Sequence, residues 1–250
     1  MHIDDIEKLK RLNIFQDVKE STFSRAIAPS FLQSFPAGTV LLRENTSADF
    51  LYIVLEGLVE MSAASDDNDT VTEILGPVNL FILAAVLNDN VCLQSARTLT
   101  PARILMIPAP LIRELLGDDQ SFMRAVVFEL ARAYRRTVKE LKKQKLRSGA
   151  KRLANWILRE YARQGQNVAM KLPFEKRVLA SYLGMTPENL SRGFATLAQY
   201  GVQASGGSIL LSDLPALTGF ANPSPLIDGE EPTVMATRGN GGRTERSPAA

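Results

Sequence analysis

Three residues with hydrogen-bonding side chains, Glu188, Ser191 and Arg192, lie within one short stretch of the chain. Their spacing of three and four residues places them on one side of a helix. An arginine can donate two hydrogen bonds to O6 and N7 of guanine, and a glutamate can accept one from the amino group of cytosine. The three residues therefore predict contacts to DNA base edges. The alternative is an exposed Glu–Arg pair, which would stabilise the helix by only about 0.3 kcal/mol.

Residues 175–200 are predicted to hold these side chains on two helices joined by a tight turn. Gly184 suits the turn because glycine adopts a positive φ at little cost. Thr186 is a favoured N-cap for the second helix, and Pro187 is a favoured first helical residue. The inward positions are Leu179, Ala180, Leu183, Leu190, Phe194 and Leu197. This pattern is a helix-turn-helix, in which the start of the second helix enters the major groove.

The same region is the most basic part of the chain. Residues 145–200 contain ten Lys and Arg against three Asp and Glu, a net charge of +7, whereas the whole chain has +2. A compact basic segment is typical of a module that touches phosphate, although a solvated helix face is the alternative. The candidates for phosphate contacts are Lys151, Arg152, Lys176, Arg177 and Thr186.

A long helix is predicted from Asp119 onward. Apolar and small residues recur along it at alternating steps of four and three, as in the seam of a coiled coil. The seam residues are Met123, Val127, Leu130, Tyr134, Thr137 and Leu141. We expect this stripe to form a dimer interface; packing of the helix on its own domain is the alternative.

The N-terminal half favours strands. Short helices are expected within residues 4–32, and strands at residues 40–41, 50–61, 71–75 and 102–107. Residues 81–87 are apolar and predict a short buried helix or turn. Near the C-terminus, residues 209–211 predict a strand of a wing, and residues from 222 onward predict a disordered tail because they are rich in Pro, Gly, Ser and charge.

The combination of these features resembles the CRP/FNR family of regulators, over about residues 5–220. The resemblance is carried by the segments at residues 35–38 and 49–59, by the long helix and by the sequence GMTPENLSR at 184–192. It implies an α+β fold with a β-roll sensor at 1–118, a dimerisation helix at 119–145, a winged helix-turn-helix at 146–221 and a tail at 222–250. It also implies a cytoplasmic homodimer that binds double-stranded DNA and contacts RNA polymerase.

The resemblance further implies which DNA is read. Glu188, Ser191 and Arg192 match the Glu-x-x-Ser-Arg motif of the FNR-like branch, which suggests a palindromic operator related to TTGAT…ATCAA. Pro187 stands where the cyclic-AMP branch has an arginine, which disfavours the operator of that branch. Gly193 also departs from the family, which has an apolar residue there, and glycine inside a helix costs about 1 kcal/mol.

The effector is left open by the sequence. In the family, cyclic AMP is held by a Gly-Glu-Leu segment and an Arg-Ser pair; here the Glu is missing and Cys92-Leu93 fall where Arg-Ser would be. We therefore expect weak or no cyclic-AMP binding, because the phosphate would lack a counter-charge. A candidate effector pocket, with ordinary core as the alternative, comprises Phe81, Ile82, Leu83, Val86 and Cys92. Haem ligation by Cys92 and His2, and thiol sensing by Cys92, are weaker alternatives.

One cysteine and one histidine restrict the chemistry of the chain. Iron–sulfur clusters and multi-ligand zinc sites are excluded within one chain, and a catalytic triad would need His2. We therefore expect no enzyme activity; carboxylate or metal-aided chemistry is the alternative. We expect neither a membrane span, because no apolar stretch is long enough, nor a signal segment, because residues 1–12 are charged. The rival hypothesis is a cyclic-nucleotide-type signalling module that does not read DNA.

Overall fold

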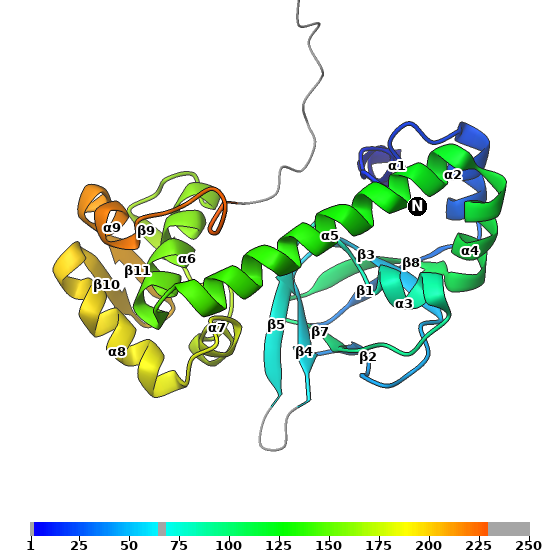
Figure 1. Ribbon diagram of the computed structural model, residues 1–250. Coiled ribbons are helices and arrows are strands. Elements are labelled where there is room, and N and C mark those ends of the chain that lie inside the picture. The colour runs from blue at the N-terminus through cyan, green and yellow to red at the C-terminus, as the bar shows by residue number, and fades with distance from the viewer. Residues whose placement is uncertain (1–2, 65–68, 230–250) are drawn as a thin grey trace, which may run out of the picture.

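The computed structural model describes residues 3–64 and 69–229. The long helix α5 (Gln120–Leu146) connects a strand-rich N-terminal part to a smaller C-terminal part (Figure 1). This α+β arrangement confirms the predicted fold class. Within the described residues, no helix is long and apolar enough to cross a membrane.

The N-terminal part is a roll of two four-stranded antiparallel sheets, in the strand orders β1-β8-β3-β6 and β2-β7-β4-β5. Fully buried residues such as Leu51, Ile53, Ile104 and Ile107 fill the space between the sheets. The strands are β1 (Phe31–Phe35), β2 (Val40–Leu42), β3 (Phe50–Glu56), β4 (Val59–Ala63), β5 (Thr70–Leu75), β6 (Leu80–Phe81), β7 (Ser95–Thr98) and β8 (Ala102–Pro108). The helices are α1 (Ile3–Lys10), α2 (Glu20–Ile27), α3 (Leu83–Asn88) and α4 (Ala109–Asp118).

Strand β1 corrects the expectation of helices throughout residues 4–32. Phe31 pairs with Met106 and Phe35 with Ala102 across the antiparallel ladder to β8. The strand has little alternation of burial, with Phe31 itself 55% exposed, so its hydrophobic pattern gives a weak local signal. Pairing with β8, which is distant in sequence, decides its conformation.

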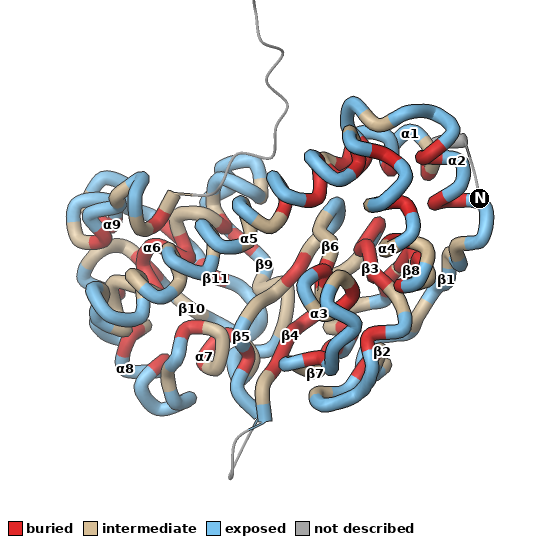
Figure 2. The backbone as a smooth tube through the Cα atoms, turned by 45° about the vertical axis from the view of Figure 1, so that its right-hand side comes forward, coloured by how far each residue is buried: buried red, intermediate tan, exposed pale blue. Residues whose placement is uncertain are grey.

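Helix α5 begins at a well-formed N-cap. The Asp119 carboxylate accepts hydrogen bonds from the backbone N–H groups of Ser121 and Phe122. One side of the helix then packs on the sensor through Phe122, Ala125 and Val126, so that buried and exposed residues alternate along it (Figure 2).

The C-terminal part has its own core, formed around Leu153, Ile157, Leu179 and Leu197. A three-stranded sheet in the order β10-β11-β9 lies beside the helices, and the predicted wing strand is part of β11. The elements are α6 (Gly149–Arg163), β9 (Ala169–Lys171), α7 (Lys176–Tyr182), α8 (Pro187–Leu197), the 3₁₀ helix η1 (Ala198–Tyr200), β10 (Val202–Ser205), β11 (Ser208–Leu211) and α9 (Leu214–Ala221).

The expectation of disorder from residue 222 onward is wrong for residues 222–229. Asp228 is only 6% exposed, and it forms an ion pair with Arg147 (2.6 Å) directly after α5. It also accepts a hydrogen bond from the Ser224 backbone N–H (2.9 Å). A buried ion pair overrides the polar, Pro-containing composition of this segment. Residues 230–250 lie outside the described residues.

Candidate nucleic-acid interface

The three predicted base-reading residues lie together on the first turns of α8, and all are exposed. The Ser191 hydroxyl donates to the Pro187 carbonyl (3.1 Å), which leaves its oxygen free to accept from a base. The pKa of Glu188 is lowered by hydrogen bonds from its own backbone N–H and from the Thr186 hydroxyl, and further by the charge of Arg192. The carboxylate is therefore ionised at neutral pH and can act as an acceptor.

The turn before α8 has the predicted local geometry. Gly184 has φ +62°, and the Thr186 hydroxyl accepts from the Asn189 backbone N–H (3.2 Å) as the N-cap of α8. A Cβ at this position would lie 2.7 Å from Oε1 of the Gln144 side chain on α5. The end of the long helix and the turn are thus in close contact.

Gly193 is explained by packing between helices. It is buried on the inner side of α8, where an added Cβ would lie 3.1 Å from Cδ2 of Leu153 on α6. The glycine shortens the distance between α6 and α8, and this close packing offsets its cost within a helix.

Arg152 does not point toward solvent as the phosphate-contact prediction requires. Its guanidinium donates to three backbone carbonyls: Leu183 (2.8 Å), Gly184 (3.2 Å) and Arg147 (2.8 Å). Burial lowers its pKa. The prediction is therefore corrected: Arg152 fixes the turn of the helix-turn-helix to the end of α5. A run of basic residues in the sequence gives no indication of which guanidinium turns inward.

The other predicted phosphate contacts differ in their surroundings. Lys176 and Arg177 are exposed at the start of α7, and the Lys176 ammonium lies 5.7 Å from the centre of the Phe194 ring. Lys151 is half-buried in the first turn of α6, and Thr186 is exposed at its capping position. The structure thus brings Lys176, Arg177 and Thr186 to the surface of the same helix pair as the base-reading residues.

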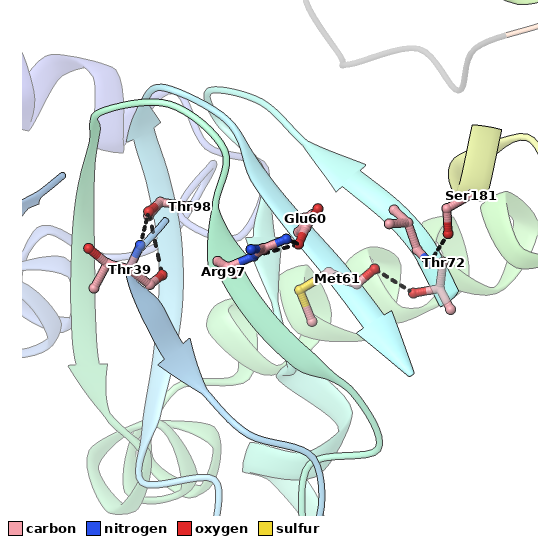
Figure 3. Close-up of polar contacts among 8 residues, drawn as sticks. Thr39, Glu60, Met61, Thr72, Arg97, Thr98 and Ser181 are labelled. Atoms are coloured by element: carbon pink, nitrogen blue, oxygen red, sulfur yellow. Dashed lines mark hydrogen bonds and ion pairs between the residues drawn. The ribbon is translucent and has the colours of Figure 1, made fainter. Parts of the chain in front are cut away.

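The helix-turn-helix also contacts the sensor. The hydroxyl of Ser181 on α7 accepts a hydrogen bond from the backbone N–H of Val71 on the edge strand β5 (2.8 Å; Figure 3). Next along β5, the Thr72 hydroxyl donates to the Met61 carbonyl on β4 (3.0 Å). The DNA-binding helices are therefore joined to the sensor sheet by a backbone contact that the sequence did not indicate.

The predicted seam of α5 is largely unpaired within one chain. Met123, Val127, Tyr134 and Leu141 are 45–71% exposed, and Thr137 is exposed as well. Leu130 departs from the prediction, since it is half-buried against the sensor core. The alternative of packing on the same domain is realised by the opposite side of the helix, around Phe122 and Val126.

The residues of the candidate effector pocket form ordinary core in this structure, which was the alternative interpretation. Phe81, Leu83, Val86 and Cys92 are at most 5% exposed and belong to the sensor core, with Ile82 packed against them. Burial, and then the charge of Asp49, raise the pKa of the Cys92 thiol, which makes it less reactive. His2 lies outside the described residues, so the structure does not describe its position relative to Cys92. No group of three or more metal-ligating side chains occurs in the described ranges.

A cavity of about 450 Å³ lies elsewhere, where β5, α5 and α6 meet. Its lining includes Thr72, Arg136, Arg159 and Tyr182, and none of the predicted pocket residues. The sequence gives no indication of this cavity because these residues come from four separate segments.

Two family models match the chain. Residues 32–119 match the cyclic nucleotide-binding domain, and residues 151–220 match the Crp-like helix-turn-helix domain. The chain therefore has the two domains of a CRP-like transcription regulator. The CRP-like cAMP-activated global transcriptional regulator of Mycobacterium tuberculosis is 26% identical to this regulator over 213 residues, which cover 83% of this chain and 95% of the relative.

Solved structures support the same fold. A protein assigned to the Crp/Fnr family from Eubacterium rectale superposes on this CRP-like chain with a TM-score of 0.72 at 17% identity, covering 86% of this chain and 100% of that one. FixK2 from Bradyrhizobium japonicum superposes with a TM-score of 0.66 at 20% identity, covering 76% and 96% of the respective chains.

Proposed function

We propose that this regulator acts as a homodimer that reads a palindromic, TTGAT-like operator through Glu188, Ser191 and Arg192. The observation that carries the proposal is that all three side chains are exposed on the first turns of α8. An acceptor, a hydroxyl and a guanidinium at that place match the donors and acceptors of base edges in the major groove. The exposed Lys176 and Arg177 would position the helix by contacting phosphates.

The exposed stripe on α5 supports a dimer. Val127, Tyr134 and Leu141 leave apolar surface in water along a helix that extends beyond the sensor core. A second copy of the same helix would cover this stripe with a self-complementary seam. The two recognition helices would then reach half-sites about one helical turn apart, and RNA polymerase would be the further partner.

We further propose that the effector is neither cyclic AMP nor an iron–sulfur cluster. Cys92 and Leu93, at the positions expected for the phosphate grip, supply no positive charge, and Cys92 is 1% exposed. The M. tuberculosis relative is named as cAMP-activated, so cyclic AMP is the alternative effector. Calorimetric titration with cyclic AMP tests this point, and micromolar affinity would contradict it.

Selection of bound sequences from random DNA, followed by mobility-shift assays, tests the reading of DNA. We expect an enriched palindrome with TTGAT-like half-sites. Arg192→Ala should weaken binding to that site by about 1–3 kcal/mol and relax the preference at one base pair of each half-site. Arg43→Ala, which removes an exposed arginine on the sensor, is the matched control.

Two results would contradict the proposal. Equal loss of affinity for the selected site and for random DNA in Arg192→Ala would show that Arg192 contacts only phosphates. Absence of any enriched sequence would favour the rival hypothesis of a signalling module that does not read DNA.

A further inference from the structure

The cavity of about 450 Å³ lies at the junction of the sensor and the DNA-binding domain. Strand β5 and the turn from it into β6 (residues 72–80) form one side, and α5 and α6 form the other. Binding pockets for small molecules have volumes of roughly 300–1,000 Å³, so the space is sufficient for a ligand.

The lining of this cavity is strongly basic. Six cationic residues and three acidic ones, Glu73, Glu129 and Glu140, line it, and Arg163 is also paired with Glu160 beside the cavity. The cationic residues are Arg132, Arg136, Lys139, Lys143, Arg159 and Arg163. In a partly buried cavity such charges repel one another more strongly than in water, and an anion would relieve the repulsion.

The acidic residues neutralise only part of this charge. Glu129 is shared between Arg132 (2.9 Å) and Arg136 (3.5 Å), and Glu140 pairs with Lys143 (2.5 Å). The contact to Arg136 is long for a charged hydrogen bond, so its guanidinium is only weakly held.

Two buried polar atoms of lining residues have no hydrogen-bond partner: Nη1 of Arg159 and Oδ1 of Asn13. Buried polar groups in native proteins are almost always satisfied, so an orphaned group calls for a specific explanation. One is a donor on a cation and the other is an amide acceptor. An anionic group would accept from the arginine, and a hydroxyl group would donate to the amide oxygen.

We propose that this cavity binds an organic phosphate that carries hydroxyl groups, with the phosphate held by Arg136 and Arg159 and a hydroxyl donating to Asn13. Arginine recognises phosphate through paired, charge-assisted hydrogen bonds, which fits the two guanidinium groups. Val78, an apolar lining residue that is 43% exposed, offers contact to the body of the ligand.

The location gives such a ligand a regulatory role. The cavity is lined by residues 72–80 of the sensor and by Arg159 on α6 of the DNA-binding domain. It lies beside the hydrogen bond from the Val71 N–H to the Ser181 hydroxyl. A ligand that contacts both parts favours the arrangement in which both are in place. The site does not depend on which DNA sequence the protein reads.

Isothermal titration calorimetry of the full chain at constant ionic strength tests the proposal with three probes: inorganic pyrophosphate, a sugar bisphosphate and adenosine triphosphate. We expect saturable binding with one site per chain, tighter for an organic phosphate than for pyrophosphate. Preference between the sugar bisphosphate and the nucleotide identifies the source of the phosphate. Inorganic sulfate is the control for simple charge screening.

Arg159→Gln and Arg136→Gln should each weaken binding about tenfold or more, and Arg159→Lys should be intermediate because it keeps the charge but not the paired donors. Arg43→Gln, on the exposed sensor surface, should bind as the wild type does. Without ligand, Arg159→Gln should melt no lower than the wild type, because it removes one of several like charges and an unpartnered buried donor. Its mobility shift with the selected DNA site should be unchanged, which separates this test from that of DNA reading.

Three outcomes would overturn the proposal. The first is the absence of saturable binding of all three probes to the wild type. The second is unchanged binding in both Arg159→Gln and Arg136→Gln, which would place the ligand elsewhere. The third is binding of sulfate as tight as that of the organic phosphates, which would show recognition of charge alone.

Discussion

Arg152 and Arg177 belong to the same basic segment but have different roles, one structural and one expected at the DNA surface. Arg152 donates to carbonyls in the turn of the helix-turn-helix and directly after α5, whereas Arg177 is exposed. We expect Arg152→Ala to lower the free energy of unfolding of the DNA-binding domain by about 1–3 kcal/mol, because three backbone carbonyls, two of them in partly buried hydrogen bonds, lose a charged donor. Urea denaturation followed by the fluorescence of Trp156, which is buried in that domain, measures the change.

Arg177→Ala is the matched variant. It should leave the unfolding free energy within about 0.5 kcal/mol of the wild type, as exposed substitutions usually do. It should weaken binding to all DNA sequences alike and reduce the salt slope by about 1. If Arg152→Ala instead behaved in the same way as Arg177→Ala, the inward role of Arg152 would be wrong.

At the scale of single residues, the features that depend on neighbours in the chain were predicted correctly. The positive φ of Gly184 and the capping hydroxyl of Thr186 depend on residues next to them in the chain, so the sequence is sufficient. The direction of Arg152 depends on carbonyls about thirty residues away, and the need for glycine at 193 depends on Leu153. Such pairings arise only when α6 and α8 pack together.

At the scale of elements, the junction between α4 and α5 depends on one carboxylate. Hydrogen bonds from Ser121, then from Thr22 (2.5 Å) on α2, lower the pKa of Asp119 well below its ordinary value of 3.8. A carboxylate with a depressed pKa in the folded state contributes stability above its unfolded pKa, and that stability is lost as pH falls through the folded pKa. The contribution is therefore complete at neutral pH.

Asp119→Asn should accordingly destabilise the sensor at neutral pH, and the difference from the wild type should shrink as pH falls below 3.8. Thr22→Val, which removes one donor, should act in the same direction with a smaller effect. Asp118→Asn is the control, since Asp118 is about half exposed in its pair with Arg25. Thermal unfolding across acidic pH measures these differences; a gap that did not depend on pH would contradict the assignment.

The elements themselves were predicted unevenly. The long helix was predicted because apolar residues recur along it at helical spacing over many residues. The strands around residues 50–61 were predicted because this stretch is strongly apolar. Strand β1 was missed because it is short and half-exposed. The cavity at the junction was missed because its cations look like solvated surface in the sequence, and only the fold gathers them from α5 and α6.

At the scale of the whole molecule, the two sides of α5 contact different partners: the sensor on one side and, we expect, a second copy of the chain on the other. One side packs on the sensor, while the stripe of Val127, Tyr134 and Leu141 is left exposed. If a second copy covers this stripe, a carboxylate placed in it would be buried without a partner, which is strongly unfavourable. We therefore expect Val127→Asp and Leu141→Asp to give monomers in sedimentation velocity experiments at concentrations where the wild type is a dimer.

Phe128→Asp is the matched control, because Phe128 is an exposed apolar residue of the same helix that lies off the stripe. It should remain a dimer and bind the palindrome with unchanged affinity. The two seam variants should retain their folded content by circular dichroism, yet bind the palindrome no better than a single half-site, because one reading helix would then be engaged at a time. Dimers that persisted in both seam variants while Phe128→Asp became monomeric would place the interface on another face of α5.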